Sequence, residues 1–588
     1  MMHVEKLLTD HIDIWSSALQ TRSTAGRGSS GKIDLYGIKK LRELILELAV
    51  RGKLVPQDPN DEPASKLLKH IAIERDELVK RKVIRKTKLF EKITITNTPF
   101  DLPDGWEWCY LNDIGDWGAG ATPSRSNSKY YNGDIPWFKS GELSSDFICD
   151  SEEKITELAL HECSLRENKV GDVLIAMYGA TIGKASILSV RGTTNQAVCA
   201  CTPYSGISNV YLLTLLKAYK RIFIGMGAGG AQPNISREKL IATIIALPPK
   251  AEQKRIICKV DELMSLCDQL EQQSLTSLEA HQQLVETLLA TLTDSQNAEE
   301  LAENWVRISQ HFDTLFTTEA SIDALKQTIL QLAVMGKLVP QDPSDETAEI
   351  LLSRLRLSRQ SKLNSIKSSN KEAETMLRKL SRLPKAELPF KIPDNWSVAH
   401  LIDICELLVD CHNKTAPYQK DGIPIIRTTN IRNRKFIATD LKFVDEKTYD
   451  FWSRRCPPEP GDIIFTREAP MGEALIIPDK AKWCLGQRTM LIRLMHDFIN
   501  NEYILLSLTE PHLLARAAET AVGLTVKHLR VGDVEKMNIP IPPLNEQRLI
   551  VEKVKDIFLR CDTLKSRLQS AQQTQLHLAD ALTDAALN

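Results

Sequence analysis

This sequence lacks the usual features of a secreted, membrane or metal-binding protein. Its 12 cysteines form no CxxC pair, and the closest two, Cys199 and Cys201, have one residue between them. No apolar run approaches the roughly 20 residues that span a bilayer. The first residues, MMHVEKLLTDHIDIW, include acids and lack the apolar core of a signal peptide. We therefore expect a cytoplasmic protein with reduced cysteines, no metal site and no membrane contact.

Motifs of catalysis are also missing. A GxGxxG pattern begins at Gly225, but Gln232-Pro233 follows at once, so no helix can begin there to hold a pyrophosphate. The GxxxGK segment from Gly179 is one residue shorter than a P-loop, and alanine follows its lysine in place of Ser or Thr. Neither HExxH nor an NPPY-like methyltransferase motif occurs. These absences predict a chain without a catalytic centre.

The chain has almost no excess charge of either sign. Its 75 Lys and Arg face 76 Asp and Glu, a net charge of −1, which excludes a uniformly basic nucleic-acid coat but allows local basic patches. A hydrophobic content of 43% is ordinary for a globular protein. Because 588 residues exceed what one core accommodates, two or more domains are expected.

A long internal repeat is the main feature that is present. Residues 41–68 (LRELILELAVRGKLVPQDPNDEPASKLL) and residues 325–352 (LKQTILQLAVMGKLVPQDPSDETAEILL) are identical at about two-thirds of their positions. Apolar residues at helical spacing from Leu41 to Ala49 predict a helix that ends at Gly52, and a second helix is predicted over 62–84. Basic stretches follow both copies. They are either solvated helix faces or arms that contact phosphate.

A second repeat pairs residues 247–270 (LPPKAEQKRIICKVDELMSLCDQL) with residues 541–564 (IPPLNEQRLIVEKVKDIFLRCDTL). In each copy the apolar residues alternate steps of four and three, which predicts a coiled-coil helix. In the first copy this seam begins at Ile256 and in the second at Ile550. The first helix, continued to Leu292, has about 40 residues and a length of about 60 Å.

Two variable segments lie between the repeats. They open alike, as PFDLPDGWEWCYLNDIGD from Pro99 and PFKIPDNWSVAHLIDICE from Pro389, so Trp106 and Trp396 take the same place and are expected in the core. Short β-branched runs between turn residues predict strands of α/β domains. We predict an α+β protein: two such domains separated by an antiparallel pair of long coiled-coil helices, with pseudo-two-fold duplication. The predicted boundaries are 1–98 (N-terminal helical region), 99–246 (first variable domain), 247–388 (central helical region), 389–540 (second variable domain) and 541–588 (C-terminal helix).

With these features the chain resembles the specificity (S) subunit of type I restriction-modification systems over its whole length. The motifs resembling a first target-recognition domain are GATPSRSN from Gly120, YYNGDIPWFKSGEL from Tyr130, YGATIGK from Tyr178, TTNQAV from Thr193 and GGAQPNIS from Gly229. PPxxEQ before a heptad helix resembles the family's spacer, and LAVxGKLVPQDP suggests the type IB branch. The second domain departs from the pattern, with TREAPMGEA from Thr466 in place of YGATIGKA.

The resemblance implies that each target-recognition domain reads one half of a split, asymmetric double-stranded DNA target. It implies that the helices set the spacing and dock two methyltransferase (M) subunits, with two restriction (R) subunits joining in the full complex. No cofactor is implied for this chain. The M subunits are expected to methylate adenine with S-adenosylmethionine, and the R subunits to translocate and cut DNA with ATP and Mg²⁺.

Direct reading of bases needs paired donors or acceptors, such as Arg or Lys for guanine and Asn or Gln for adenine. Candidates in the first domain are Arg125, Asn127, Lys129, Lys139, Ser140, Tyr178, Thr181, Lys184, Asn195, Gln196, Gln232 and Asn234. Candidates in the second are Asn413, Lys414, Arg427, Thr428, Thr429, Asn430, Arg432, Arg434, Arg467, Gln487, Arg488, Thr525 and Lys527. Each of these residues is otherwise a loop cap or a solvated charge.

A rival interpretation is a pseudo-symmetric coiled-coil scaffold that joins partner proteins without reading DNA sequence. The near-zero net charge favours it, and it predicts no sequence preference in a DNA pull-down with partners present. An autonomous enzyme would need a cofactor site, which the motifs do not supply.

Overall fold

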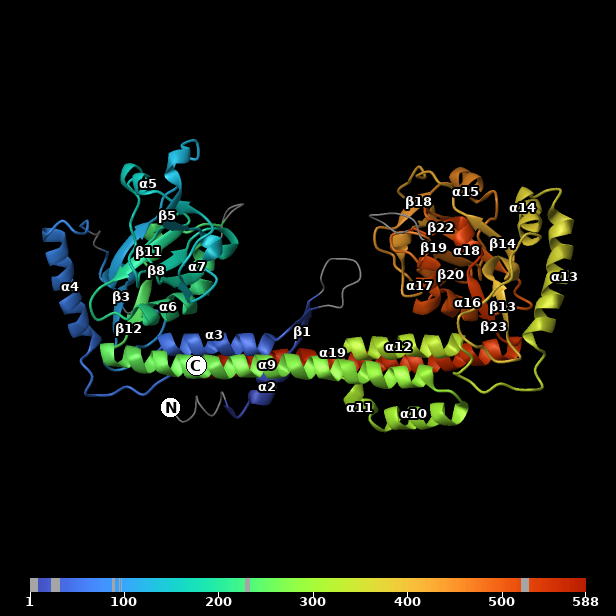
Figure 1. Ribbon diagram of the computed structural model, residues 1–588, viewed down its shortest axis with the longest axis horizontal. Coiled ribbons are helices and arrows are strands. Elements are labelled where there is room, and N and C mark those ends of the chain that lie inside the picture. Colours follow the sequence, from blue (N-terminus) through green and yellow to red (C-terminus); the bar gives the residue numbers. More distant parts are fainter. Residues whose placement is uncertain are drawn as a thin grey trace. The chain divides into compact units, whose positions relative to one another are not determined.

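The computed structural model describes residues 9–22, 32–86, 90–94, 96, 98–227, 233–519 and 528–587. Its contacts divide the chain into two units, Met1–Ser277 with Ser570–Asn588 (unit 1) and Leu278–Gln569 (unit 2). Both contain helices and small sheets, so the α+β class is confirmed (Figure 1). Among the described residues, no helix is long and apolar enough to cross a membrane.

The N-terminal region of unit 1 is helical. It contains α2 (Ile12–Ser17), the antiparallel pair β1 (Gln20–Arg22) and β2 (Lys32–Asp34), α3 (Tyr36–Val50) and α4 (Ala64–Lys80). The apolar stripe of α3 is buried, with Leu44 and Leu48 0% exposed. Gly52 follows α3 with φ +66°, a conformation that side chains with a Cβ disfavour, as expected for a glycine that ends a helix.

The equivalent region of unit 2 has five described helices, against three in unit 1. Its elements are α10 (Ala298–Gln310), α11 (Phe312–Leu315), α12 (Glu319–Val334), α13 (Ala348–Ile366) and α14 (Lys371–Leu380). The basic stretch after the second repeat forms α13 and α14, and part of it faces inward. Arg359 is 5% exposed and donates to Asp403, so it does not belong to a phosphate-contacting arm.

The two predicted spacer helices are α9 (Lys250–Asp294) and α19 (Leu544–Leu587). Each helix contributes its beginning to one unit and its end to the other. The predicted seam is buried: Ile256 and Cys267 of α9 and Ile550 of α19 are each 0% exposed. The apolar residues at four-three spacing therefore form the packed faces of these helices.

Within each unit, one copy of the first repeat contacts both long helices. In unit 1, Arg42 of α3 forms an ion pair with Asp268 of α9 (2.7 Å), and Tyr36 donates to Asp580 of α19. In unit 2, Lys326 of α12 forms an ion pair with Asp562 of α19. Lys326 occupies the position in its repeat that Arg42 occupies in the first. The end of α9 also reaches α12, because Val285, Leu289 and Leu292 belong to one core with Leu325 and Ile329.

The variable domain of unit 1 is built on two small sheets. A five-stranded sheet has the order β4 (Gly115–Ala119), β11 (Val198–Pro203), β8 (Val173–Ala176), β9 (Ala185–Leu188) and β6 (Phe147–Ile148). A three-stranded sheet has the order β10 (Thr193–Thr194), β5 (Tyr131–Phe138) and β7 (Lys154–Ile155). The helices are α5 (Glu157–Glu162), α6 (Asn209–Ala218), α7 (Lys220–Gly227) and α8 (Arg237–Ile241). At the base, β3 (Glu107–Tyr110) pairs antiparallel with β12 (Ile244–Leu247) and so closes the domain.

The variable domain of unit 2 repeats this plan, but its larger sheet has four strands in place of five. Its four-stranded sheet has the order β14 (Cys405–Asp410), β22 (Thr489–Leu494), β19 (Ile463–Thr466) and β20 (Ala474–Ile476). Its three-stranded sheet has the order β18 (Lys442–Val444), β15 (Ile423–Ile426) and β21 (Cys484–Leu485). A hairpin, β16 (Ile431–Arg432) and β17 (Lys435–Phe436), and helices α15 (Glu446–Ser453), α16 (Asn501–Leu508), α17 (Pro511–Glu519) and α18 (Val531–Glu535) complete it. The base is closed by β13 (Ser397–His400) paired with β23 (Asn538–Ile541).

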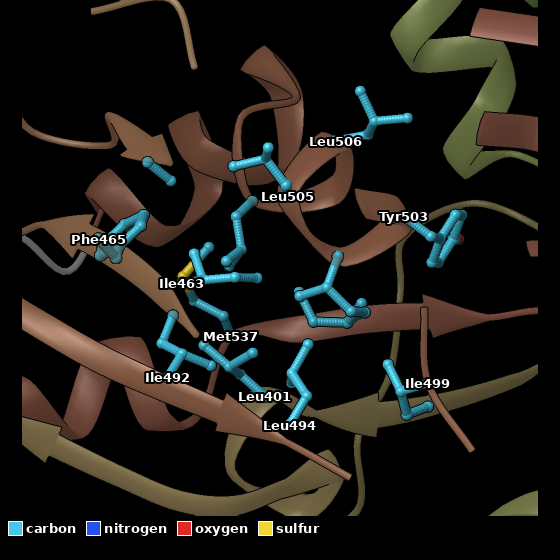
Figure 2. Close-up of a cluster of buried hydrophobic side chains, with 14 of the residues drawn as sticks. Leu401, Ile463, Phe465, Ile492, Leu494, Ile499, Tyr503, Leu505, Leu506 and Met537 are labelled. Carbon is cyan, nitrogen blue, oxygen red and sulfur yellow. The ribbon is translucent and has the colours of Figure 1, made fainter. Parts of the chain in front are cut away.

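Helix α16 covers one face of the four-stranded sheet (Figure 2). Ile463 and Phe465 of β19 and Ile492 of β22 are each 0% exposed, as is Tyr503 of α16. The Tyr503 hydroxyl donates to the carbonyl of Pro540 in the basal strand (2.8 Å), which satisfies the polar atom that burial would otherwise leave unpaired. The sheet, the helix and the base of the domain therefore share one core.

The PPxxEQ motif of each long helix joins that helix to its variable domain. In unit 1, Glu252 is 0% exposed and accepts hydrogen bonds from Gln57 (3.2 Å) and from the indole of Trp106 (3.0 Å). Burial raises the pKa of the Glu252 carboxyl, and the bonds from Gln57 and Trp106 oppose that rise. The next residue, Gln253, accepts from the backbone of Ser208 in front of α6.

The same arrangement, which we call the glutamate clamp, recurs in unit 2. Glu546 accepts from Gln341 (3.1 Å) and from the indole of Trp396 (3.0 Å), and burial raises its pKa. Gln547 accepts from the backbone of Asn500 in front of α16. Each clamp thus connects three segments that are distant in sequence. The prediction that both tryptophans lie in the core is confirmed, since Trp106 is 6% and Trp396 5% exposed.

Candidate nucleic-acid interface

The loops that carry most of the first domain's candidate residues meet at one edge of its sheets. Strand β5 ends at Phe138 and β10 at Thr194, and these two strands are parallel, so the following loops leave on the same side. The Asn195 amide donates to the Phe138 carbonyl (3.0 Å), and the Ala121 amide donates to the Thr194 carbonyl (3.0 Å). Residues 120–127, 139–142, 177–184, 195–197 and 233–234 form this edge, which we call rim 1.

Further backbone bonds hold the loop after β8 within rim 1. The Met177 amide donates to the Ala197 carbonyl (2.8 Å), and the Gly179 amide donates to the Pro233 carbonyl (2.8 Å). Gly179 has φ +61°, and a side chain there would be strained. At Gly120 the constraint is space, because a Cβ would lie 2.1 Å from the Thr194 carbonyl oxygen. The backbone is therefore tightly fixed beneath the candidate side chains.

Rim 1 brings together ten of the predicted side chains: Arg125, Asn127, Lys139, Ser140, Tyr178, Thr181, Lys184, Asn195, Gln196 and Asn234. Asn127 and Lys129 lie in or beside the short 3₁₀ helix Ser128–Tyr130 that follows the first rim loop. Some of these residues also have local structural bonds: Asn127 caps that helix, and Thr181 donates to the Tyr178 carbonyl. Gln232 lies outside the described residues.

Rim 2 is the equivalent edge of the second domain, formed by residues 411–416, 427–430, 467–472 and 486–488. The Gly486 amide donates to the Ile426 carbonyl (2.8 Å) at the end of β15, and the Cys411 amide donates to the Thr489 carbonyl (3.0 Å) after β14. The candidates in rim 2 are Asn413, Lys414, Arg427, Thr428, Thr429, Asn430, Arg467, Gln487 and Arg488. Thr525 and Lys527 lie outside the described residues.

Acidic side chains hold the cations of both rims. In rim 1, Glu153 binds Arg125 (2.6 Å) and Lys139 (2.6 Å). These hydrogen bonds, first from Arg125 and then from Lys139, lower the pKa of Glu153 to about 2. In rim 2, Asp440 binds Lys442 (2.6 Å) and Arg427 (2.9 Å), and these partners lower the pKa of Asp440. Both carboxyls are therefore ionised at neutral pH.

The base-reading candidates named from the sequence were cations, amides and hydroxyls, and they did not include these acids. A carboxylate accepts hydrogen bonds from the amino group of cytosine, so acids at the ends of the strands are a relevant signal. Lys442 was missed as well, because it lies in β18 rather than in a loop that follows a strand.

Comparisons with known proteins show the family to which the chain belongs. The family described as "Type I restriction modification DNA specificity domain" matches residues 103–280 and again residues 393–573. The chain is 43% identical to the type I restriction enzyme EcoEI specificity subunit and 43% identical to the EcoAI specificity subunit, both from Escherichia coli. Each alignment covers 100% of both chains. Among solved structures, the HsdS subunit from Thermoanaerobacter tengcongensis has 18% identity and a TM-score of 0.40, covering 84% of this chain and 99% of that one.

The chain belongs to the type I restriction-modification DNA specificity family. DNA target recognition is its function. The resemblance found in the sequence is thereby confirmed, and the two rims are the surfaces of this family member that carry its predicted base-reading residues. Within the described residues, no cluster of three or more His, Cys, Asp or Glu could hold a metal ion.

The structure argues against direct DNA contact by Asn430. This residue is 0% exposed. Its side-chain oxygen accepts from the Arg427 amide, and its side-chain nitrogen donates to the carbonyls of Ile437 and Thr439. Glu142 in the first domain likewise accepts from the amide of Lys139. Asn430 therefore caps the short helix Thr428–Asn430 and does not reach a ligand. Thr428, at 8% exposed, is buried in the same helix.

Arg434 is also placed away from rim 2. Its guanidinium lies 5.2 Å from the ring centroid of Phe558 on α19 and donates to the hydroxyl of Thr509 (3.2 Å). Burial lowers the pKa of Arg434, because the charged form loses water. The side chain of Arg432 donates to carbonyls of its own segment, including that of Thr428 (2.7 Å). Arg434 connects the β16–β17 hairpin to the long helix, which excludes it from the candidate readers.

Proposed function

We propose that this chain is the sequence-recognition subunit of a type I restriction-modification complex, in which each variable domain reads one half of a split, asymmetric DNA target. The observation that carries the proposal is the pair of rims. Both domains present loops at the same edge of equivalent sheets, yet the side chains on those loops differ: rim 1 carries Lys139 and Tyr178, rim 2 Arg427 and Arg467. Equivalent surfaces with unlike donors suit two unlike half-sites.

The long helices are the proposed spacer and docking elements. We propose that α9 and α19 pair antiparallel and set the distance between the half-sites. Contacts of the first repeat support this proposal, since α3 binds the beginning of α9 and the end of α19. Leu284 of α9 and Leu559 of α19 are 51% and 67% exposed, and such apolar side chains suit a surface for M subunits.

In the proposed complex, two M subunits and two R subunits join this chain on double-stranded DNA in the cytoplasm. The M subunits methylate adenine with S-adenosylmethionine, and the R subunits use ATP and Mg²⁺. We assign no catalytic step and no cofactor to this chain. Its role is to bind the target through many phosphate contacts and few base contacts.

The test is adenine-methylation mapping in a cell that gains this chain together with its M subunit. A new split motif, with modified adenines in both halves, is the expected result. If the same M subunit is active with another S subunit but gives no new motif with this chain, the scaffold interpretation replaces the proposal.

A further inference from the structure

At each rim an acid from a neighbouring segment lies between two cations: Glu153 comes directly before β7, and Asp440 lies in the turn before β18. In rim 1, Glu153 accepts from Arg125 through both of its oxygens (2.6 and 3.3 Å) and from Lys139 (2.6 Å). In rim 2, Asp440 binds Arg427 through one oxygen (2.9 Å) and Lys442 through the other (2.6 Å). We call these sets trio 1 and trio 2.

The two trios occupy the same place in the fold but use different positions. Lys139 directly follows β5, and Arg427 directly follows the equivalent β15. Ile135 pairs with Ile155 in one domain, as Ile423 pairs with Val444 in the other. This register makes Lys442, not Asp440, the counterpart of Glu153. Asp440 lies two residues before Lys442, in the turn that precedes β18, and Lys442 itself supplies the second cation.

In this respect the trios differ from the contacts that hold the fold together. The ion pairs Arg42–Asp268 and Lys326–Asp562 use the same positions of both repeats, and so do the glutamate clamps. A contact that only holds the fold together is retained at fixed positions, as these are. The trios instead form one charge arrangement from unlike residues at different positions.

The chemistry of a trio matches the edge of a base pair. Each ionised carboxylate has about four acceptor sites, and the cations occupy only part of them. Side-chain exposure leaves the remainder accessible, at 32% for Glu153 and 61% for Asp440. In the major groove, guanine presents the acceptors N7 and O6, and the cytosine paired with it presents the N4 amino donor. A cationic donor beside an anionic acceptor is complementary to that edge.

Trio 1 is also held rigidly. The Arg125 guanidinium lies 4.7 Å from the ring centroid of Tyr131 and 5.2 Å from that of Trp137. Because the aromatic rings and Glu153 fix the plane of the guanidinium, little side-chain entropy remains to be lost on binding.

We infer that Glu153 and Asp440 are specificity-determining residues, each accepting a hydrogen bond from a cytosine amino group while its cations donate to the paired guanine. Each trio then reads one G·C pair, one in each half of the target. This inference rests on the proposed function and assigns residues to it.

The experiment compares methylation motifs in cells that carry the M subunits with the wild-type chain, Glu153→Gln or Asp440→Asn. The amide retains the shape but replaces one acceptor oxygen with a donor. We expect E153Q to reduce discrimination at one G·C position in one half by about 5- to 150-fold, and D440N to do so in the other half. Asp134→Asn and Asp421→Asn, exposed acids of the same domains outside the trios, are the matched controls and should leave the motif unchanged.

Several outcomes would overturn the inference. If the wild-type chain gives a split motif and both variants give the same motif, the trios do not read bases, and the proposed function is unaffected. Absence of any motif with the wild-type chain refutes the proposed function itself. If the variants bind every DNA sequence more weakly by the same factor, measured by competition binding with the purified complex, the trios contact phosphate and do not read bases. If E153Q does not assemble with M, the test uses Glu153→Asp, which retains the charge on a shorter side chain. An unchanged motif in that variant would mean that Glu153 has only a structural role.

Discussion

At the scale of single residues, the rims separate side chains that can meet DNA from side chains that hold the fold. Arg427 and Arg434 are seven positions apart and were equivalent candidates in the sequence. In the structure Arg427 follows β15 into rim 2, whereas Arg434 packs on Phe558 of α19. Residue type alone suggested both, but Arg434 lies in the turn of the β16–β17 hairpin, where its side chain contacts α19.

Replacing Arg427 with alanine should weaken binding of target DNA by the S–M complex by about 1–3 kcal/mol and relax one base position in one half-site. The reason is the loss of a planar donor group at the end of a strand in rim 2. Fluorescence anisotropy with single-base variants of the mapped target measures both effects. Arg434→Ala is the matched control and should leave base preference unchanged. Equal losses on all sequences would make Arg427 a phosphate contact.

At the scale of elements, the glutamate clamp is what connects a variable domain to a long helix. Glu252 and Glu546 begin their helices, and each accepts from a tryptophan at the start of a domain and from a glutamine of the LVPQDP turn. The three repeated motifs that appear separate in the sequence are thus partners in one contact. A buried carboxylate that loses a donor is costly, so the motifs are coupled.

The clamps predict a dependence of stability on pH. Burial raises the pKa of Glu252 and Glu546 above the ordinary value of 4.5. The folded state therefore binds more protons, and stability decreases as pH rises from 4.5 through the raised values. The double variant E252Q/E546Q has no such titration. Urea denaturation at several pH values should show the wild type losing stability relative to the variant. Glu552→Gln, at an exposed position of α19, is the control. Stability–pH profiles of the wild type and of E252Q/E546Q that run parallel would contradict the prediction.

The seam of α19 provides a second prediction at this scale. Ile550 is 0% exposed and lies in the large core of unit 2, whereas Leu559 on the same helix is 67% exposed. Ile550→Ala should lower the free energy of unfolding by about 2–5 kcal/mol, because a cavity is left in the core. Leu559→Ala should change the stability of the isolated chain by less than about 0.5 kcal/mol. Chemical denaturation of both variants measures the difference. Equal losses would mean that the assigned face of the helix is wrong.

At the scale of the whole molecule, the chain consists of two halves built from the same parts. Each half has a repeat helix, α3 or α12, a domain closed by a two-stranded base, and a clamp where the long helix begins. The halves differ where α14 packs against β14 and α13 in unit 2. Unit 1 has no described helix at the corresponding residues. In that unit, a groove between α4 and β3 has a volume of about 640 Å³.

If the domains are interchangeable modules, a graft of residues 389–539 in place of residues 99–245 should still assemble with M subunits. The clamp residues outside the graft, Gln57 and Glu252, would meet Trp396 in place of Trp106. Methylation mapping should then show a motif whose two halves are inverted repeats of one sequence, because the domains are related by a pseudo-two-fold axis. Co-purification with M is the accompanying control. A folded graft that does not bind M would refute the modular interpretation.

The sequence by itself determined the parts of this protein. Periodicity located the helices because an amphipathic helix must bury one stripe, so α3, α9 and α19 lie close to their predicted positions. The similar openings of the two variable segments placed both tryptophans in the core. Boundaries were less accurate: the helix predicted over 62–84 is α4, which covers Ala64–Lys80.

Only the tertiary structure decided which residues meet. Trp106, Gln57 and Glu252 are up to 195 positions apart, and no local pattern states that they share hydrogen bonds. The same holds for the rims, where parallel β5 and β10 bring two loops to one edge. Strand register placed Lys139 beside Glu153 and turned Asn430 and Arg434 inward. Helical period is a local property of the chain, whereas the pairing of strands from distant segments depends on the packing of the complete domain.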